Sequence, residues 1–391
     1  MRSDCRTGGM VTTLAPVARF RSLLEQHHRE LTALATTVET ARTARTEWEW
    51  ALAALNPQPR RAGWLTGRRP LGTVYVRMPA TLPVYSFALF AVGALLPGNR
   101  VVVRPAGPSR HVVGPLVRLA REAGLPIELH TGGWEDFEAE AGESADGFVF
   151  CGGPDRADRL AAVLPDRTRL LYQGPGCCAF VVTAEADPVR AAEAVVRTRL
   201  FNSSQDCLAT ERVYVADRVL DGFLAALDAR LDEVSYGADN TADIDVGPLL
   251  LDARAADWYR RIADGEGTVL RAGRNLGGSL YETCVVEAAP DSPLVLDEKY
   301  CPVLPVVRYR NDPELRDMLR LGDYALGLTV HGRLPSFGTL DFGHVAVGTT
   351  HYDLESPLSP FGGYRRTTFV RTGDGLRRGP ALVPYEMSTR G

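Results

Sequence analysis

The chain has 391 residues, 45% of them hydrophobic and 24% charged, which is long enough for two domains with large buried cores. Its net charge of −4, without a basic stripe or tail, argues against a nucleic-acid partner. The most apolar stretch, residues 86–97, is too short to span a bilayer and predicts a buried helix, so we expect no membrane association. The N-terminus lacks the pattern of a signal peptide, and the seven cysteines are an odd number, so we expect a cytoplasmic protein with reduced thiols and no metal site.

In chain order, the spacing of apolar residues predicts helical structure over 17–56. Strands and helices then alternate, with strands over 73–77, 101–104, 127–130 and 146–151 and helices over 85–96, 111–123 and 156–164. A second alternating set runs from about 179 to about 350 and includes a helix over 188–200 and a strand over 212–215. Such alternation predicts parallel strands joined by crossover helices, and therefore an α/β fold.

The segment FNSSQDC, residues 201–207, carries the strongest candidate for chemistry. We predict that Cys207 lies at a polar helix start, where the helix dipole and backbone N–H groups would lower the pKa of a thiol. Cys207 is therefore the candidate nucleophile. We interpret Cys177, Cys178 and Cys301 as ordinary packing residues.

Six segments resemble motifs of the aldehyde dehydrogenase superfamily, in the family's order and over nearly the whole chain. FNSSQDC is similar to the nucleophile motif Asn-x-Gly-Gln-x-Cys, with Ser204 in place of the glycine. The others are MPATLP at 78–83 (Pro-Trp-Asn-Phe-Pro in the family), VRPAG at 103–107 (Lys-Pro-Ser-Glu), FCGG at 150–153 (Phe-Thr-Gly-Ser), DEKYCPV at 297–303 (Glu-Glu-x-Phe-Gly-Pro-Val) and PFGG at 360–363. The resemblance implies a Rossmann-type NAD(P)-binding domain over 10–173, a catalytic domain over 174–366 and a C-terminal oligomerisation arm over 367–391.

The resemblance also implies a role for each matching residue. Cys207 would attack an aldehyde carbon to form a thiohemiacetal, and hydride transfer to a nicotinamide would leave a thioacyl enzyme. Thr81 stands where the family has the Asn that helps to hold the oxyanion. The cofactor-binding positions are Arg104 and Gly107 on the adenosine side, Gly152 and Gly153 under the pyrophosphate, and Glu298 and Tyr300 at the nicotinamide ribose. Because Gly107 replaces a carboxylate that repels a 2′-phosphate, we expect NADP to be accepted or preferred over NAD.

The main departure from the family is Gln173, which stands where the resemblance places the glutamate that activates the hydrolytic water. An amide nitrogen has no basic lone pair, so Gln173 cannot act as a general base, although it could orient a water or an acyl group. Three accounts remain open. The acyl group could move to or from a thiol such as coenzyme A or an acyl carrier protein, or hydrolysis could use a substitute base, with Asp206 and Glu211 nearest in sequence. The chain could also be a catalytically silent binding or scaffold protein.

We therefore predict an NAD(P)-dependent oxidoreductase that interconverts an aldehyde and an acyl thioester without hydrolysis. The segment 56–70 is compressed relative to the family, whose neighbouring hairpin supports tetramers, so we expect a homodimer. The sequence does not indicate which aldehyde is the substrate.

Overall fold

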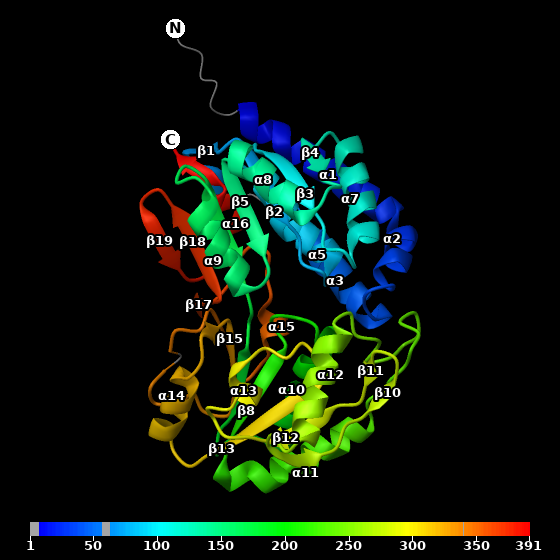
Figure 1. The fold of residues 1–391 in the computed structure, drawn as a ribbon, viewed down its shortest axis with the longest axis vertical. Helices are drawn as coiled ribbons and strands as arrows, with labels where there is room; N and C mark the ends of the chain where they lie inside the picture. The colour runs from blue at the N-terminus through cyan, green and yellow to red at the C-terminus, as the bar shows by residue number, and fades with distance from the viewer. Residues whose placement is uncertain (1–7, 57–62, 339) are drawn as a thin grey trace.

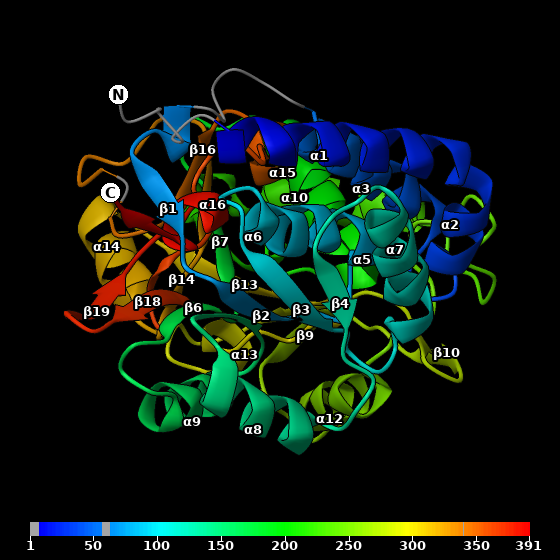
Figure 2. The same cartoon turned by 90° about the horizontal axis from the view of Figure 1, so that it is seen from above.

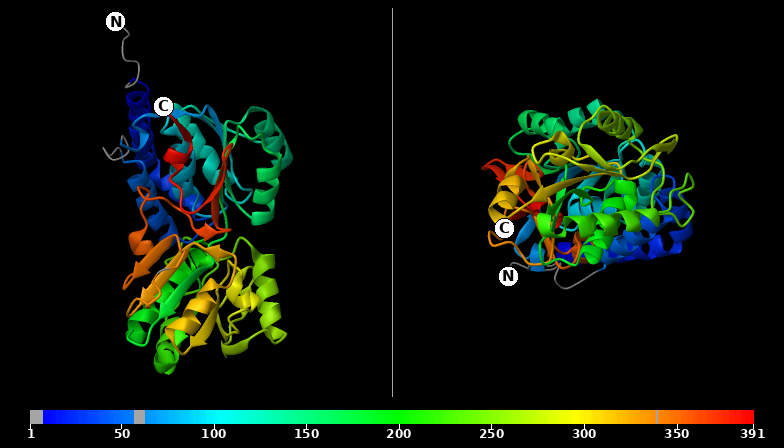
Figure 3. Two further views of the ribbon diagram at one scale, coloured as in Figure 1. Left: turned by 90° about the vertical axis from the view of Figure 1, so that its left-hand side faces the viewer. Right: turned by 90° about the horizontal axis from the view of Figure 1, so that it is seen from below.

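A computed structural model describes residues 8–56, 63–338 and 340–391. Two lobes lie one above the other, each built around a seven-stranded sheet (Figure 1). Turning the molecule about its vertical axis shows the same two stacked lobes (Figure 3). The predicted α/β class is confirmed, because helices cover largely parallel sheets in both lobes.

The first sheet has the strand order β19-β18-β6-β5-β2-β3-β4. Its five strands from the N-terminal half are parallel, whereas β18 is antiparallel to β6 and β19 is antiparallel to β18. The parallel strands are short apolar runs, as expected for a sheet that is covered on both faces. The strands are β2 (Thr73–Arg77), β3 (Arg100–Arg104), β4 (Ile127–Leu129), β5 (Gly147–Cys151), β6 (Arg169–Gln173), β18 (Thr368–Thr372) and β19 (Gly375–Arg378).

Helices lie on both faces of this sheet (Figure 2). The predicted helical structure over 17–56 consists of three helices, and the hydroxyl of Thr40 caps the third by accepting from the N–H of Thr43. One core contains residues of α1 (Gly8–Gln26), α2 (His28–Ala35), α3 (Ala41–Ala54), α5 (Pro83–Ser86), the π-helical turn η1 (Phe87–Val92), α6 (Gly93–Leu95) and α7 (Arg110–Glu122). On the other face lie α9 (Pro154–Val163) and α8 (Trp134–Ser144), the second of which the sequence pattern did not reveal.

The second sheet has the order β16-β15-β7-β8-β13-β12-β9, and only its edge strand β9 runs antiparallel to its neighbour. The strands are β7 (Cys178–Val182), β8 (Thr210–Ala216), β9 (Thr268–Arg271), β12 (Cys284–Glu287), β13 (Val303–Tyr309), β15 (Gly327–His331) and β16 (His344–Val347). Its helices are α10 (Pro188–Leu200), α11 (Leu220–Asp232), α12 (Asp252–Ala263), α13 (Pro293–Leu296), α14 (Asp312–Arg320) and α15 (His351–Leu354), with the 3₁₀ turns η2 (Phe201–Ser204) and η3 (Asp217–Val219).

The C-terminal residues return to the first lobe. Strands β18 and β19 extend its sheet, α16 (Val383–Glu386) follows, and β20 (Ser388–Arg390) pairs with β1 (Arg68–Pro70). Two further ladders join β10 (Asn275–Gly277) to β11 (Leu280–Tyr281) and β14 (Tyr324–Ala325) to β17 (Tyr364–Arg365). Within the expected arm over 367–391, β18 and β19 thus belong to the first sheet and β20 to a separate ladder with β1, and the part of the arm in oligomerisation stays a prediction. Among the described residues, none of the helices has the length and apolarity needed to cross a membrane.

Candidate active site

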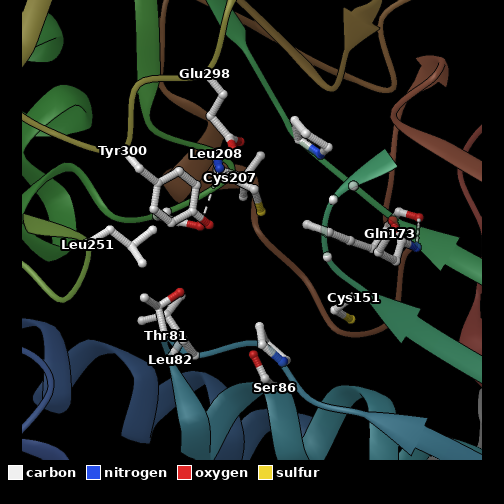
Figure 4. Close-up of a pocket in the computed structure, with 18 of the residues that line it drawn as sticks. Thr81, Leu82, Ser86, Cys151, Gln173, Cys207, Leu208, Leu251, Glu298 and Tyr300 are labelled. Atoms are coloured by element: carbon white, nitrogen blue, oxygen red, sulfur yellow. Dashed lines mark hydrogen bonds between the residues drawn. The ribbon is translucent and has the colours of Figure 1, made fainter. Parts of the chain in front are cut away.

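A cavity of about 460 Å³ lies between the lobes and is lined by residues of both. Figure 4 shows Cys207 and Glu298 facing it from the second lobe, and Thr81 and Gln173 from the first. The three catalytic candidates of the sequence analysis, Cys207, Thr81 and Gln173, therefore line a single cavity. Cys151, which the sequence did not single out as a thiol, lines it as well.

The expected helix start at Cys207 is wrong. Helix α10 ends at Leu200, and Cys207 lies beyond its C-terminal end, in a turn that leads into β8. The dipole of this helix therefore does not favour a thiolate. Burial, together with the nearby carboxyls of Asp206 and Glu298, raises the pKa of Cys207 well above its usual range. The thiol consequently needs a proton acceptor before it can attack.

The turn before Cys207 is strained. Asn202, Ser203 and Ser204 have left-handed φ angles of 49°, 54° and 69°, a conformation that costs about 1–2 kcal/mol for each non-glycine residue. Side-chain hydrogen bonds hold the turn: Asn202 Nδ2 donates to the carbonyl of Gln205 at 3.0 Å, and Ser203 Oγ accepts a backbone N–H at 2.9 Å. Glycine adopts a left-handed φ without steric cost, which explains why the family motif has glycine at the position of Ser204.

Thr81 is held from a distant helix. The loop that carries it ends in Leu82, which has a left-handed φ of 49°. The buried carboxylate of Glu47, on α3, accepts the N–H groups of Val84 and Tyr85 at 3.1 Å each. These two bonds fix the beginning of α5 and with it the position of Thr81, and no motif in the sequence marks Glu47.

The side chain of Gln173 is committed to the C-terminal segment. Its Oε1 accepts a hydrogen bond from Thr368 Oγ1 at 2.8 Å, and its Nε2 donates to the carbonyl of Phe361 at 3.2 Å. Both ends of the amide thus tie the end of β6 to the PFGG turn and to β18. This geometry favours a structural role for the amide over the orientation of a water.

Glu298 is buried beside the nucleophile. Its Oε1 accepts the N–H of Gly176 at 2.8 Å, and its carboxylate points toward Cys207 in Figure 4. Burial, reinforced by the negative charge of Glu211, raises the pKa of Glu298 to about 7. This value makes Glu298 a group that can exchange a proton at neutral pH.

Of the two substitute bases considered from the sequence, Glu211 is locked in ion pairs. It contacts Arg199 Nη1 and Lys299 Nζ, each at 2.9 Å, and all three side chains are at most 1% exposed. Although burial opposes ionisation, these cations lower the pKa of Glu211 to about 2. The carboxyl of Asp206 accepts a hydrogen bond from the hydroxyl of Tyr352 at 2.8 Å.

A second hollow of about 610 Å³ lies beside the cavity, and Arg77, Gly152 and Gly153 line both. Gly152 and Gly153 immediately precede α9, so the N-terminus of that helix faces the hollow. A Cβ on Gly152 would lie 2.7 Å from the ring of Phe150, so only glycine fits there. The backbone can therefore approach a phosphate closely, as a dinucleotide site requires.

Four arginines gather on this hollow. Three of them stand over the ring of Trp134, with guanidinium carbons at 5.9 Å (Arg77), 5.4 Å (Arg104) and 4.6 Å (Arg156) from its centroid. Gly107 lines the hollow too, and space is open where its side chain would be. A pyrophosphate with a nearby ribose fits such a cationic, glycine-bounded hollow. No motif in the sequence contains Trp134, Arg156 or Arg159, the fourth arginine, so their place in this hollow was not predicted.

These features define a two-domain α/β protein with a cysteine in the cleft and a dinucleotide-type groove next to it. The sequence model of the "Aldehyde dehydrogenase family" matches residues 18–376, and the chain belongs to this family. It is 26% identical over 333 residues to the "Aspartate-semialdehyde dehydrogenase (Non-phosphorylating)" of Halomonas elongata, which covers 79% of this chain and 66% of that protein. It is 28% identical over 321 residues to the "NADP/NAD-dependent aldehyde dehydrogenase PuuC" of Escherichia coli, covering 77% of this chain and 64% of that protein. The chain thus spans slightly less than two thirds of the length of these relatives.

Solved structures share the fold. The glyceraldehyde-3-phosphate dehydrogenase GapN of Methanocaldococcus jannaschii, complexed with NADP, superimposes with a TM-score of 0.86 at 18% identity, covering 97% of this chain and 88% of that one. A 1-pyrroline-5-carboxylate dehydrogenase from Thermus with bound NAD has a TM-score of 0.84 at 19% identity, covering 97% and 81%. At these identities the likeness concerns the fold.

Proposed function

We propose that the chain is an NAD(P)-dependent oxidoreductase that interconverts an aldehyde and an acyl group through Cys207. The observation that carries this proposal is the position of Cys207. Among the cysteines in the described ranges it alone is partly exposed, and the cavity that it lines shares Arg77, Gly152 and Gly153 with the arginine-lined hollow. A nicotinamide cofactor bound there would accept or supply the hydride.

Proton transfer comes first, because the pKa of Cys207 is raised. Glu298, which has a pKa of about 7, faces the thiol and would accept its proton. The thiolate then forms a bond to the aldehyde carbon, and the carbonyl electron pair moves onto oxygen. The hydroxyl of Thr81 and the N–H of Cys207 would donate to this oxyanion.

Loss of the hydride to a bound nicotinamide would leave a thioacyl group on Cys207, and this group would then pass to a thiol rather than to water, which frees the Cys207 thiol. Three observations support this. The amide of Gln173 is bound at both ends, Glu211 is neutralised by two cations, and the carboxyl of Asp206 is buried and hydrogen-bonded. The partners we propose are therefore an aldehyde or acyl thioester, coenzyme A or an acyl carrier protein, and a second copy of the chain in a homodimer.

We propose that Arg104 holds the adenosine ribose, with Gly107 beside it leaving room for a 2′-phosphate. Gly152 and Gly153 admit the pyrophosphate, and Glu298 and Tyr300 meet the nicotinamide ribose. The arginines over Trp134 favour a 2′-phosphate, since guanidinium groups bind phosphate in bidentate fashion. NADP should bind at least as tightly as NAD. Calorimetric titration with both cofactors tests this, and a clear preference for NAD would contradict it.

Product analysis tests the acyl step. The protein is incubated with an aldehyde and NADP, with and without coenzyme A or pantetheine, and both free acid and thioester are quantified. Thioester formed only with the thiol, and little acid without it, supports the proposal. Rapid release of acid without a thiol favours the hydrolytic alternative, with Glu298 as the group able to activate water. The Cys207→Ala variant should form neither product.

A further inference from the structure

Asp206 and Glu355 are two of the four carboxyl groups that line the catalytic cavity, beside Asp297 and Glu298. Asp206 precedes the nucleophile, and Glu355 follows α15. Within the described part of the chain neither carboxyl forms an ion pair; each receives a tyrosine hydroxyl, Asp206 from Tyr352 at 2.8 Å and Glu355 from Tyr85 at 2.5 Å. The two carboxyls are close enough that each adds to the effect of burial in raising the pKa of Tyr85.

Two arginines of the described ranges, Arg77 and Arg254, line this cavity, but neither forms an ion pair with Asp206 or Glu355. Arg77 donates to the carbonyls of Met78 and Cys151 at 2.9 and 2.8 Å. Arg254 donates to the carbonyl of Glu298 and stands over the ring of Tyr300 at 5.8 Å. Both guanidinium groups are thus bound to backbone carbonyls, and Arg77 also lines the cofactor hollow.

Aromatic rings stand beside the carboxyls. Trp50 and Tyr85 both line the cavity, with ring centroids 5.4 Å apart. Behind them Trp50 is stacked on Tyr352 at 6.0 Å, with an angle of 10° between the planes. We call the four lining residues Trp50, Tyr85, Asp206 and Glu355 the acid–aromatic wall.

Asp206 is buried and Glu355 is half-buried, and holding two like charges there without a counter-ion is unfavourable. Burial raises the pKa of Glu355 to about 7, with a further contribution from Asp206, and burial also raises the pKa of Asp206. A cationic group in the cavity would relieve this repulsion and would also be attracted to the faces of the aromatic rings. An anionic group would add to the repulsion.

We propose that the acid–aromatic wall selects aldehydes that carry a cationic nitrogen, an amine or a quaternary ammonium, over neutral and anionic aldehydes. This inference rests on the proposed function, because it names the substrate class of the same site. The carbonyl carbon would lie at Cys207, and the cationic end would lie against Glu355 and Trp50.

Three substrates that differ in charge test the wall. They are trimethylammoniobutyraldehyde, its neutral isostere with carbon in place of nitrogen, and succinic semialdehyde, compared at about pH 8, where Glu355 is ionised. We expect kcat/KM for the cation to exceed that for the isostere by about tenfold or more, and succinic semialdehyde to be the poorest. In Glu355→Gln this ratio should fall toward one. The matched control Glu193→Gln, an exposed acid on α10, should keep it. A ratio of one or less in the wild type would overturn the inference, as would a ratio that Glu355→Gln leaves intact.

Binding separates this inference from the proposed function. If no aldehyde is turned over, the proposed function has failed. The wall is then tested by calorimetry with hydroxypropyltrimethylammonium and its neutral carbon isostere. Cation binding about tenfold tighter, lost in Glu355→Gln, would still establish a cation site. Equal affinities, or no binding of either, would refute it.

Discussion

Changing Gln173 to Glu is the sharpest test of how this chain departs from its family. The amide bridges Thr368 and Phe361. A carboxylate would still accept from the Thr368 hydroxyl, but it could not donate to the Phe361 carbonyl. In Gln173→Glu the Phe361 carbonyl would be unpaired and would face a negative oxygen, which should lower the free energy of unfolding by about 1–3 kcal/mol.

The loss should depend on pH. When the carboxyl introduced by Gln173→Glu is protonated, it could donate to the Phe361 carbonyl, so folding favours the protonated form and raises the pKa of this carboxyl above its unfolded value. Its contribution to stability is then fully present below the unfolded pKa and is lost as the pH rises through the folded pKa. The variant should therefore be closer to the wild type at about pH 5 than at about pH 8.

Urea denaturation followed by tryptophan fluorescence measures both effects. Gln26→Glu, at an exposed position on α1, is the matched control and should change stability by less than about 0.5 kcal/mol. The Gln173→Glu variant should also release more free acid from an aldehyde, since it restores a carboxylate to the cavity wall. If Gln173→Glu were as stable as the wild type at both pH values, the bridging role would be refuted.

Three further predictions follow from the contacts around the nucleophile. Cys207→Ala should lower turnover by at least about 10³-fold while leaving NADP affinity unchanged by calorimetry; full activity would refute the covalent mechanism. Asp206→Asn removes a negative neighbour that raises the pKa of Cys207, so alkylation of Cys207 by iodoacetamide at about pH 8 should accelerate. An unchanged rate would show that Asp206 does not raise the pKa of this thiol. Glu211→Gln leaves Arg199 and Lys299 buried without a counter-charge and should cost about 3–5 kcal/mol in urea denaturation. Because the folded pKa of Glu211 is depressed, the wild type should lose this stabilisation as the pH falls from about 4.5 toward 2, whereas the variant should show a flatter profile.

The sequence by itself determined the α/β class, most of the alternating elements and the residues that meet in the cleft. Helix α10 runs over the predicted 188–200, because hydrophobic periodicity and a Pro at the first turn are local signals. The motif around Cys207 was equally visible, although its helix-start interpretation failed. A backbone of three left-handed residues is held there by hydrogen bonds that sequence spacing does not show.

The tertiary structure decided what these residues can do chemically. Gln173 is bound by Thr368, 195 positions away, and Asp206 by Tyr352, 146 positions away. Glu211 meets Lys299 across 88 positions, which removes it as a base and leaves Glu298 with a pKa near neutrality. A side chain's proton affinity and its free hydrogen-bonding capacity depend on burial and on neighbouring charges, and folding brings these together from distant parts of the chain.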